Sequence, residues 1–550
     1  MNMNIYLFTL PTALLLLLAS TGSAQTITVD IADTELIDVD PDTATVADLP
    51  GPDGHISFSE AMIASNNTPG RQTVGFAIPT SEWTYLPTFY PGRAPVTGLM
   101  FYGAQDEVTI DGTTQTAFTG DTNPDGHEVM IAGSGLWINA DNCRVTGLDY
   151  TTLWWDGSNG VIENNSVMAI DISGVSGGSG TLVRGNTGGT VQIDQSSDNV
   201  VVGNTFRHVR VLGWIPGGHP ATNNRIGGPT LAERNYLTGS GSVSSQGFPG
   251  GYAIQLFHSI GTTIENNWIG TTRDGLAQGN PYTTIGISFD TENYDTVIRN
   301  NLIAGILAVA RPPHSQSYFV GTGIQLWGTG SGVTIVGNRI GLNANDEPLL
   351  GGVEGITMED AFYPGGIQNV VIGGTAAGEG NEIAGHLGTA IRLAPTYSGV
   401  RITGNSIHDN GGLGIDLITG MFQAGVTPND LLDTDTGGNR LQNFPVIKGA
   451  MRTAGGVLVR GELASEALRT YTIDSYASSS LDPSGFGEGA RFLGSTSVAT
   501  NAQGRATFQA SFANAVPAGW FVTATATDLE RADTSEFSRG RRLVQAFKVR

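Results

Sequence analysis

Two carboxylates, Asp290 and Glu359, hold the same position in two short apolar–polar segments, and Trp327 holds it in the segment between them. If these segments are stacked strands ~4.8 Å apart, the two backbones lie about 9–10 Å apart. An inverting glycosidase needs two carboxyl groups about 6.5–9.5 Å apart with a water between them. The spacing therefore predicts Asp290 and Glu359 as a catalytic pair. Trp327 would be a sugar platform, beside which Gln325 and Arg392 bind hydroxyl or carboxylate groups.

The alternative is a solvated β-face that carries polar residues without chemistry. Six segments share the pattern on which the catalytic interpretation depends, with apolar residues at their first and third positions. They are 254–257, 287–290, 324–327, 356–359, 391–394 and 415–418. A period of two turns the apolar positions inward and the second and fourth positions outward. Phe257 then shares the outward fourth column with Trp327 and is a further candidate for substrate binding.

A second chemical candidate is an acidic loop with Asp430, Asp433 and Asp435. Alternating carboxylates followed by glycine supply the hard oxygens and the bend that calcium loops use. Asp416 lies in the Gly-rich stretch 411–419, which fits one copy of a nine-residue calcium repeat, so it is a further candidate ligand. These residues predict a calcium site. The alternative is an acidic linker without a metal.

A second repeat must build the elements that position these residues. It reads aliphatic, any residue, Gly or Asn, then Asn, with the last Asn at positions 165, 186, 204, 267, 301, 338 and 405. Gly and Asn tolerate the left-handed backbone region, so each copy predicts a strand, a one-residue bend and a strand. The repeated Asn can then stack along a column. The two longest intervals suggest hidden copies, one of them near Asn381.

Short strands, Gly/Asn bends and stacked aliphatic residues predict a parallel β-helix. The alternative is a β-propeller, which needs units of about 40 residues with hairpin turns and antiparallel strands. Such units are not evident in the sequence.

Residues 53–61 resemble the N-terminal SLREA box of the right-handed parallel β-helix repeat proteins that bacteria export, which have the pectin-lyase-like fold. Phe58 and Ser59 stand where the box has Leu-Arg. The resemblance extends over most of residues 50–540 and implies fold more than function. Independently, Ser57 and Glu60 form a capping-box pattern, which predicts a short helix that closes the open end of the solenoid.

The pattern changes after residue 445, where alternating stretches separated by turns favour a β-sandwich. The fold class we expect is therefore all-β: a right-handed parallel β-helix with a short N-terminal capping helix and a C-terminal β-sandwich. The expected parts are a signal peptide over 1–24, a cap and first coils over 25–130, the β-helix over 131–445, the sandwich over 446–540 and a basic tail over 541–550.

The apolar stretch from Ile5 to Leu18, followed by Gly22-Ser23-Ala24, is typical of a cleaved export signal, and it is too short for a good membrane span. One cysteine, Cys143, excludes an intramolecular disulfide. We therefore expect a secreted or cell-surface protein without a transmembrane span.

Acidic residues outnumber basic ones 50 to 27, which gives a formal net charge of −23. This charge disfavours nucleic acids and anionic membranes as partners. Lysine occurs only at Lys448 and Lys548, so a lyase with a lysine base in the solenoid is excluded.

Three functions remain open. The first is an adhesin-like or polysaccharide-contacting scaffold at the cell surface. The second is a polysaccharide-degrading enzyme, a glycoside hydrolase rather than a lyase, that acts in a cleft along the β-helix. The third is a structural layer or matrix protein. The sequence names neither the glycan nor the partner.

Overall fold

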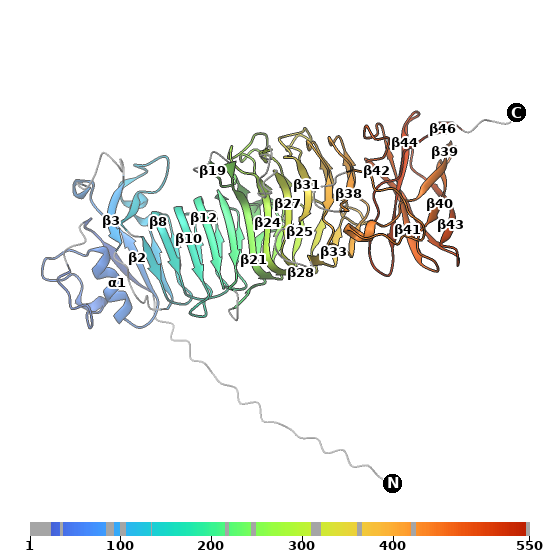
Figure 1. The fold of residues 1–550 in the computed structure, drawn as a ribbon. Helices are drawn as coiled ribbons and strands as arrows, with labels where there is room; N and C mark the ends of the chain where they lie inside the picture. The colour runs from blue at the N-terminus through green and yellow to red at the C-terminus, as the bar shows by residue number, and fades with distance from the viewer. Residues whose placement is uncertain are drawn as a thin grey trace, which may run out of the picture.

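The computed structural model describes residues 24–545, except for 33–36, 84–92, 99–105, 134, 215–218, 244–248, 310–320, 360–365 and 420–424. The signal peptide predicted over 1–24 therefore lies outside the described residues, apart from Ala24. The described chain forms an elongated stack of strands with a separate pair of sheets at its C-terminal end (Figure 1).

The stack is a solenoid with three faces of parallel strands, and beyond the N-terminal coils each circuit of the chain contributes to all three faces. The first face has 13 strands: β1 (Gln25–Val29), β2 (Gln72–Phe76), β4 (Val108–Asp111), β7 (Arg144–Thr146), β9 (Val161–Glu163), β11 (Leu182–Arg184), β13 (Val200–Val202), β17 (Arg225–Gly227), β22 (Thr263–Glu265), β25 (Val297–Arg299), β29 (Thr334–Val336), β33 (Val370–Ile372) and β36 (Val400–Ile402).

The second face carries the segments in which the sequence placed its carboxylates, and we call it the ladder face. Its strands are β6 (Leu136–Ile138), β8 (Leu148–Trp155), β10 (Ser166–Ser173), β12 (Thr187–Asp194), β15 (His208–Leu212), β21 (Tyr252–Ile260), β24 (Ile285–Tyr294), β27 (Thr322–Trp327), β31 (Glu354–Glu359), β35 (Ile391–Leu393) and β38 (Ile415–Leu417).

The third face begins with β3 (Ala94–Gly98) and β5 (Val129–Gly133) and continues through the first halves of β8, β10 and β12. It then runs through β14 (Thr205–Phe206), β18 (Tyr236–Leu237), β23 (Trp268–Ile269), β26 (Leu302–Ile303), β30 (Arg339–Ile340), β34 (Glu382–Ala384) and β37 (Ser406–His408). Short strands extend the coils beyond the ladder face: β16 (Ala221–Thr222), β28 (Thr329–Ser331) and β32 (Ile367–Gln368). A small antiparallel pair joins β19 (Ser242–Val243) to β20 (Pro249–Gly250).

Aliphatic side chains fill the interior, as the period of two predicted. The first and third positions of the six ladder segments are all 1% exposed or less, from Ile254 and Leu256 in β21 to Ile415 and Leu417 in β38. They belong to one continuous cluster of buried residues that begins at Ile27. Removal of this apolar surface from water is the main driving force for stacking the coils.

A column of buried asparagines lies at the corner between the first and third faces. Each donates a hydrogen bond from Nδ2 to Oδ1 of the next, at 2.9–3.1 Å. The nine members are Asn165, Asn186, Asn204, Asn235, Asn267, Asn301, Asn338, Asn381 and Asn405. The predicted asparagine column is confirmed, and Asn235 and Asn381 are the copies hidden in the two long intervals. The residue before each of the seven predicted members has the expected left-handed φ, for example 53° at Asn164 and 57° at Asn300.

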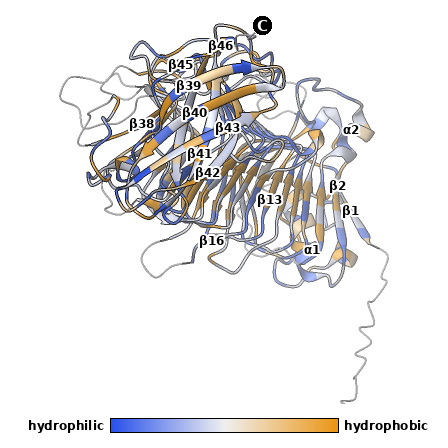
Figure 2. Cartoon of the chain, turned by 90° about the vertical axis from the view of Figure 1, so that its right-hand side faces the viewer, coloured by the Kyte–Doolittle hydropathy of each residue, from blue (hydrophilic) through white to orange (hydrophobic). Residues whose placement is uncertain are grey.

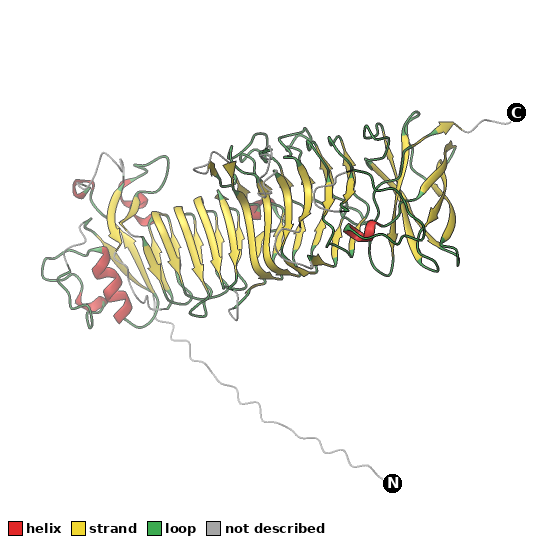
Figure 3. Ribbon diagram, viewed as in Figure 1, coloured by secondary structure: helices red, strands yellow, loops and turns green. Residues whose placement is uncertain are grey.

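The predicted capping helix is α1 (Phe58–Asn67), and the Ser57–Glu60 capping box is present. Phe58 and Met62 are fully buried in the N-terminal end of the core. Among the described residues, helices are few and short (Figure 3): besides α1 there is α2 (Thr113–Thr119), with single turns at Val46–Asp48, Thr80–Glu82, Leu231–Glu233 and Gly438–Leu441.

Two four-stranded sheets form the predicted β-sandwich. One has the order β43 (Arg505–Phe512), β40 (Gly456–Ala464), β39 (Val446–Thr453) and β46 (Val544–Gln545). The other has the order β42 (Arg491–Ala499), β41 (Thr470–Ser478), β44 (Phe521–Asp528) and β45 (Arg541–Arg542). Because β45 and β46 pair with these sheets, four of the first five residues of the predicted tail are strand, and 546–550 lie outside the described residues.

The sandwich covers the C-terminal end of the solenoid, where its strands lie in front of the stacked coils in Figure 2. Tyr476 and Phe537 of the sandwich join the solenoid core. Thr403 Oγ1 donates to Asp474 Oδ2 at 2.6 Å, and the backbone of Ile402 donates to Thr534 Oγ1 at 2.9 Å. The exposed edge that a parallel solenoid would otherwise present is therefore occupied by a folded domain.

We expect Asn301→Ala, in the middle of the asparagine column, to destabilise the solenoid. The change removes the Oδ1 that accepts from the backbone and Nδ2 of Asn267, and the Nδ2 that donates to Asn338. A buried group left without its partner costs about 1–3 kcal/mol. Denaturant unfolding should show this loss, whereas the control Asn300→Gly, at an exposed left-handed position, should stay close to wild type. Equal stability of the two variants would contradict a structural role for the column.

Candidate functional site

The outward fourth column of the ladder face has the predicted register. Phe257 pairs with Asp290 in β21 and β24, and Trp327 pairs with Glu359 in β27 and β31. Phe257, Asp290 and Trp327 are half-buried. Asp290 accepts hydrogen bonds from Gln255 Nε2 and from Ser288 Oγ, and burial raises the pKa of its carboxyl group against the effect of those bonds.

Glu359, in contrast, belongs to a buried ion-pair group. Arg392 Nη2 donates to Glu359 Oε1 at 2.9 Å, and Arg392 Nε lies 2.8 Å from Glu354 Oε1. The Glu359 side chain is 5% exposed, and Gln325 is 3% exposed. The expectation that Gln325 and Arg392 face an open cleft is therefore wrong, because Arg392 is held between two carboxylates and Gln325 is covered. Catalysis by Asp290 and Glu359 stays a prediction.

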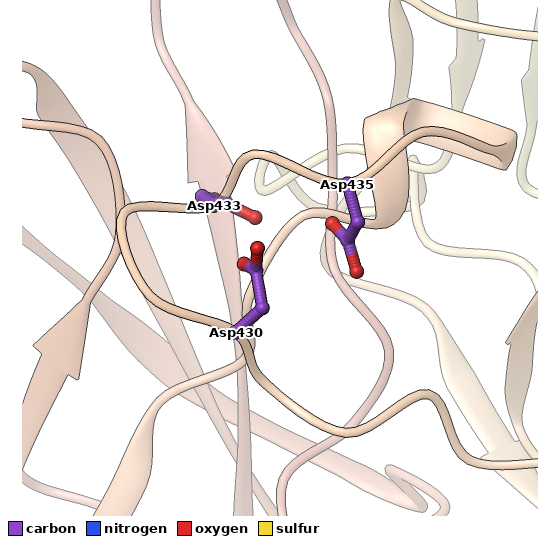
Figure 4. A group of neighbouring side chains, drawn as sticks. All are labelled: Asp430, Asp433 and Asp435. Carbon is purple, nitrogen blue, oxygen red and sulfur yellow. The ribbon is translucent and has the colours of Figure 1, made fainter.

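The predicted calcium ligands separate into two places. Asp430, Asp433 and Asp435 offer carboxylate oxygens that all lie within 4.8 Å of one another (Figure 4). Asp416 is not among them. Its position in β38 stacks it on Arg392 of β35, and it accepts a hydrogen bond from the backbone of Gly425 at 3.2 Å. The prediction of Asp416 as a fourth ligand is corrected because strand register fixes it on the ladder face.

The three aspartates could hold a metal ion. Asp433 accepts hydrogen bonds from Gln442 Nε2 at 2.6 Å and from the backbone of Asn443 at 3.0 Å. Asp430 Oδ1 and Asp435 Oδ1 are shielded from solvent and accept no hydrogen bond from the described residues. Burial raises the pKa of Asp433 to about 7, and the charges of Asp430 and Asp435 act in the same direction. A cation would relieve this mutual repulsion.

The outward residues at the second position of the ladder segments also form a column, which we call the second column. It is longer than the sequence suggested. Strand register stacks one outward residue from each of eleven successive strands: Trp137, Trp154, Asp171, Gln192, Arg210, Gln255, Ser288, Gln325, Thr357, Arg392 and Asp416. The first six are half-buried and the last five are buried. The second column is thus accessible along its N-terminal half and covered along its C-terminal half.

A cavity of about 420 Å³ lies on this accessible half. Trp137, Trp154, Asp171, Gln192 and Asp194 are among the residues that line it. We call it the tryptophan–aspartate cavity.

Arg210 organises the side chains next to this cavity. Its Nη1 donates to Gln192 Oε1 at 2.9 Å, and its Nε donates to Gln255 Oε1 at 3.1 Å. Gln255 in turn donates to Asp290. These bonds connect the cavity with the fourth-column carboxylate through one polar chain of side chains.

The sequence contains a signal for the cavity that the six-segment pattern did not include. The apolar–polar–apolar order also occurs at 136–138, 153–155, 170–172, 191–193 and 209–211. The polar or amphipathic residue in the middle of each is a member of the second column. Extension of the ladder toward the N-terminus would have found Asp171 and Gln192.

Residues 248–431 match the family model described as "Right handed beta helix region". No curated protein matches the chain. Among the described residues, no helix has the length and apolar character needed to cross a bilayer.

Solved structures with a similar arrangement include a streptococcal adhesin, an alginate lyase and a tailspike. PfbA, a surface adhesin of Streptococcus pneumoniae, has 11% identity and a TM-score of 0.30, over 66% of this chain and 83% of that one. Alginate lyase AlyF-OU02 in complex with G6 has 12% identity and a TM-score of 0.33, over 72% of this chain and 92% of that one. Dettilon tailspike protein (gp208) has 11% identity and a TM-score of 0.28, over 88% of this chain and 93% of that one. These similarities are too weak to indicate a function for this chain.

Glu536 of the sandwich is buried at the junction with the solenoid. The backbones of Leu417 and Thr427 donate to Glu536 Oε1 and Oε2 at 3.1 and 3.0 Å. Burial raises the pKa of Glu536 from its ordinary 4.5 to about 8, and nearby Asp416 adds to the shift. The folded state therefore binds this proton more tightly than the unfolded state.

The stabilisation from Glu536 should be complete below about pH 4.5 and lost as the pH rises to about 8. We expect the melting temperature of the wild type to fall over this range, and Glu536→Gln to show a smaller fall because its side chain does not titrate. Melting curves from pH 5 to 9 would measure it, with the partly exposed Glu462→Gln in the same domain as control. Parallel curves for wild type and Glu536→Gln would contradict the assignment.

Proposed function

We propose that this protein is exported, is displayed at a cell surface or secreted, and binds a polysaccharide along the ladder face of its β-helix. The observation that carries the proposal is the accessible half of the second column, where aromatic, carboxylate and amide side chains line one cavity. Ligand sites in proteins commonly combine an apolar or aromatic wall with a few fixed polar groups. Parallel strands repeat this surface at ~4.8 Å intervals, which suits a linear polymer.

Charge supports a glycan over other polymers. The chain has a formal net charge of −23, which disfavours nucleic acids and anionic membranes. The residues that line the tryptophan–aspartate cavity are tryptophan, aspartate, glutamine, serine and the aliphatic Ile172 and Val175. Among the described residues, none that line it is basic.

A second candidate function is hydrolysis of the bound glycan by Asp290 and Glu359. The observation in its favour is the half-buried carboxyl of Asp290, whose pKa burial raises, because a general acid must keep its proton near neutral pH. Glu359 lies two strands further along the same column and would be the base. The buried contact between Glu359 and Arg392 weighs against this function, since a base must reach a water.

A glycan panel with product analysis separates the two functions. Binding without product release supports the scaffold, whereas release of reducing ends supports the hydrolase. In the hydrolase case, Asp290→Asn and Glu359→Gln should each reduce turnover by a factor of at least about 100, the scale of general acid–base catalysis. Glu292→Gln, a more exposed position of β24, is the control. Turnover unchanged in both variants would overturn the assignment of the pair, and no bound glycan would overturn the proposed function.

We further propose that Asp430, Asp433 and Asp435 bind calcium near the junction of solenoid and sandwich. The support is the convergence of three carboxylates and the two shielded oxygens, since calcium takes several oxygen ligands from one flexible loop. A structural layer protein that assembles in calcium is the alternative use of such a site.

Calcium should raise the melting temperature of the full-length protein, because a ligand that binds only the folded state stabilises it. Asp435→Asn should abolish the shift, and Asp482→Asn, in an exposed turn, should retain it. Calorimetry with calcium chloride and scans in chelator would measure both effects. Identical melting curves with calcium and with chelator, together with no heat of binding, would refute the site; ordered assembly on calcium addition would favour the layer protein.

A further inference from the structure

We propose that the tryptophan–aspartate cavity is a binding subsite for a neutral, pyranose-based glycan and discriminates against acidic glycans. This inference rests on the proposed function and goes further, because it assigns a location and a ligand class. Its basis is the geometry of five side chains that line the cavity: Trp137 of β6, Trp154 of β8, Asp171 of β10, and Gln192 and Asp194 of β12.

The aromatic wall of the cavity comes from Trp137 and Trp154. Their backbones pair directly in β6 and β8, ~4.8 Å apart along the solenoid axis, so the two side chains extend from the same column. Both are half-buried, and both line the cavity. Trp137 Nε1 donates to Asp156 Oδ2 at 2.7 Å, which fixes the orientation of that ring. A fixed, partly exposed indole offers an apolar face to the C–H face of a sugar ring at little entropic cost.

Hydrogen-bonding groups continue the same surface. Asp171 stacks next to Trp154, and Gln192 stacks next to Asp171. Neither carboxylate oxygen of Asp171 accepts a hydrogen bond from the described residues. Gln192 Oε1 accepts a hydrogen bond from Arg210. The Nε2 group at the other end of the same amide is the donor that Gln192 can offer a ligand. A carboxylate acceptor and an amide donor side by side match sugar hydroxyls, which both donate and accept.

The charges of the cavity define the ligand class. Asp156, Asp171 and Asp194 all line it. Burial raises the pKa of Asp171, and the nearby charge of Asp194 adds to the shift, so the two carboxylates already repel each other. A uronate or sulfate would bring another negative charge into this partly desolvated space, which is a repulsive element against acidic ligands.

Arg210 does not reverse this preference. Its guanidinium already donates to Gln192 on one side and to Gln255 on the other. An acidic ligand would have to displace one of these bonds and still face three carboxylates. The half-exposed positions of Arg210 and Gln255 instead extend the polar surface by two more strands, along which a neutral chain can continue.

The test is calorimetric titration of the full-length protein with neutral hexasaccharides (cello-, xylo-, manno- and malto-series) and with acidic ones (oligogalacturonate and oligoguluronate). We expect at least one neutral series to bind and the acidic ones to bind at least about tenfold more weakly. Trp154→Ala should raise Kd for the neutral ligand about tenfold or more. The control Phe118→Ala removes an exposed aromatic side chain that does not line the cavity.

A second variant tests the charge argument in a protein whose fold is disturbed very little. Asp171→Asn keeps the shape of the side chain, so it should weaken neutral binding and at the same time strengthen binding of oligogalacturonate relative to wild type. A merely structural role for Asp171 would not produce these opposite changes. Asp42→Asn, at an exposed aspartate outside the cavity, controls for net charge.

Each outcome has a distinct meaning. Neutral binding that neither Trp154→Ala nor Asp171→Asn changes beyond the controls would place the site elsewhere, which overturns this inference and leaves the proposed function intact. Acidic ligands that bind as tightly as neutral ones would overturn the ligand class. Absence of binding to every glycan would overturn the proposed function, and this inference with it.

Discussion

The buried asparagine column is the constraint on which the rest of the structure depends. Each side-chain amide bonds to the next at 2.9–3.1 Å, so each coil can sit on its neighbour in only one register. A shift of one residue would leave a buried amide without its partners, and it would also turn the aliphatic residues of every strand outward. The polar column and the apolar core therefore enforce the same register from different sides of the coil.

This register determines where chemistry can occur. Residues far apart in the chain become neighbours on the ladder face, as Arg210 and Gln255 do, and they can meet only residues at the same position of adjacent strands. An outward column is thus the natural unit of function in this fold. The change from half-buried to buried residues along the second column shows that strand register alone does not decide which part of a column meets solvent.

Much of the fold could be predicted because its rules are local. Gly or Asn before the repeated Asn indicated the left-handed bend, and a period of two indicated the interior. Asn235 and Asn381 were harder to find because each departs from the repeat: Arg234 stands where Gly or Asn is expected before Asn235, and Gly378 stands where an aliphatic residue is expected before Asn381. The exposure of Gln325 and Arg392 could not be predicted, since it depends on contacts between coils. Asp416 was grouped with Asp430 because its Gly-rich stretch fits one copy of a calcium repeat, whereas strand register places Asp416 on the ladder face.

The direction of the inter-coil hydrogen bonds also has a mechanical consequence. The strands run across the long axis of the molecule, so the backbone bonds between coils and the asparagine bonds lie roughly along it (Figure 1). A pulling force applied between the two ends acts on these bonds in series, and each coil contacts only its neighbours. Under tension the rod should yield first at its weakest interface and lengthen coil by coil, while the coils on either side of the break remain folded.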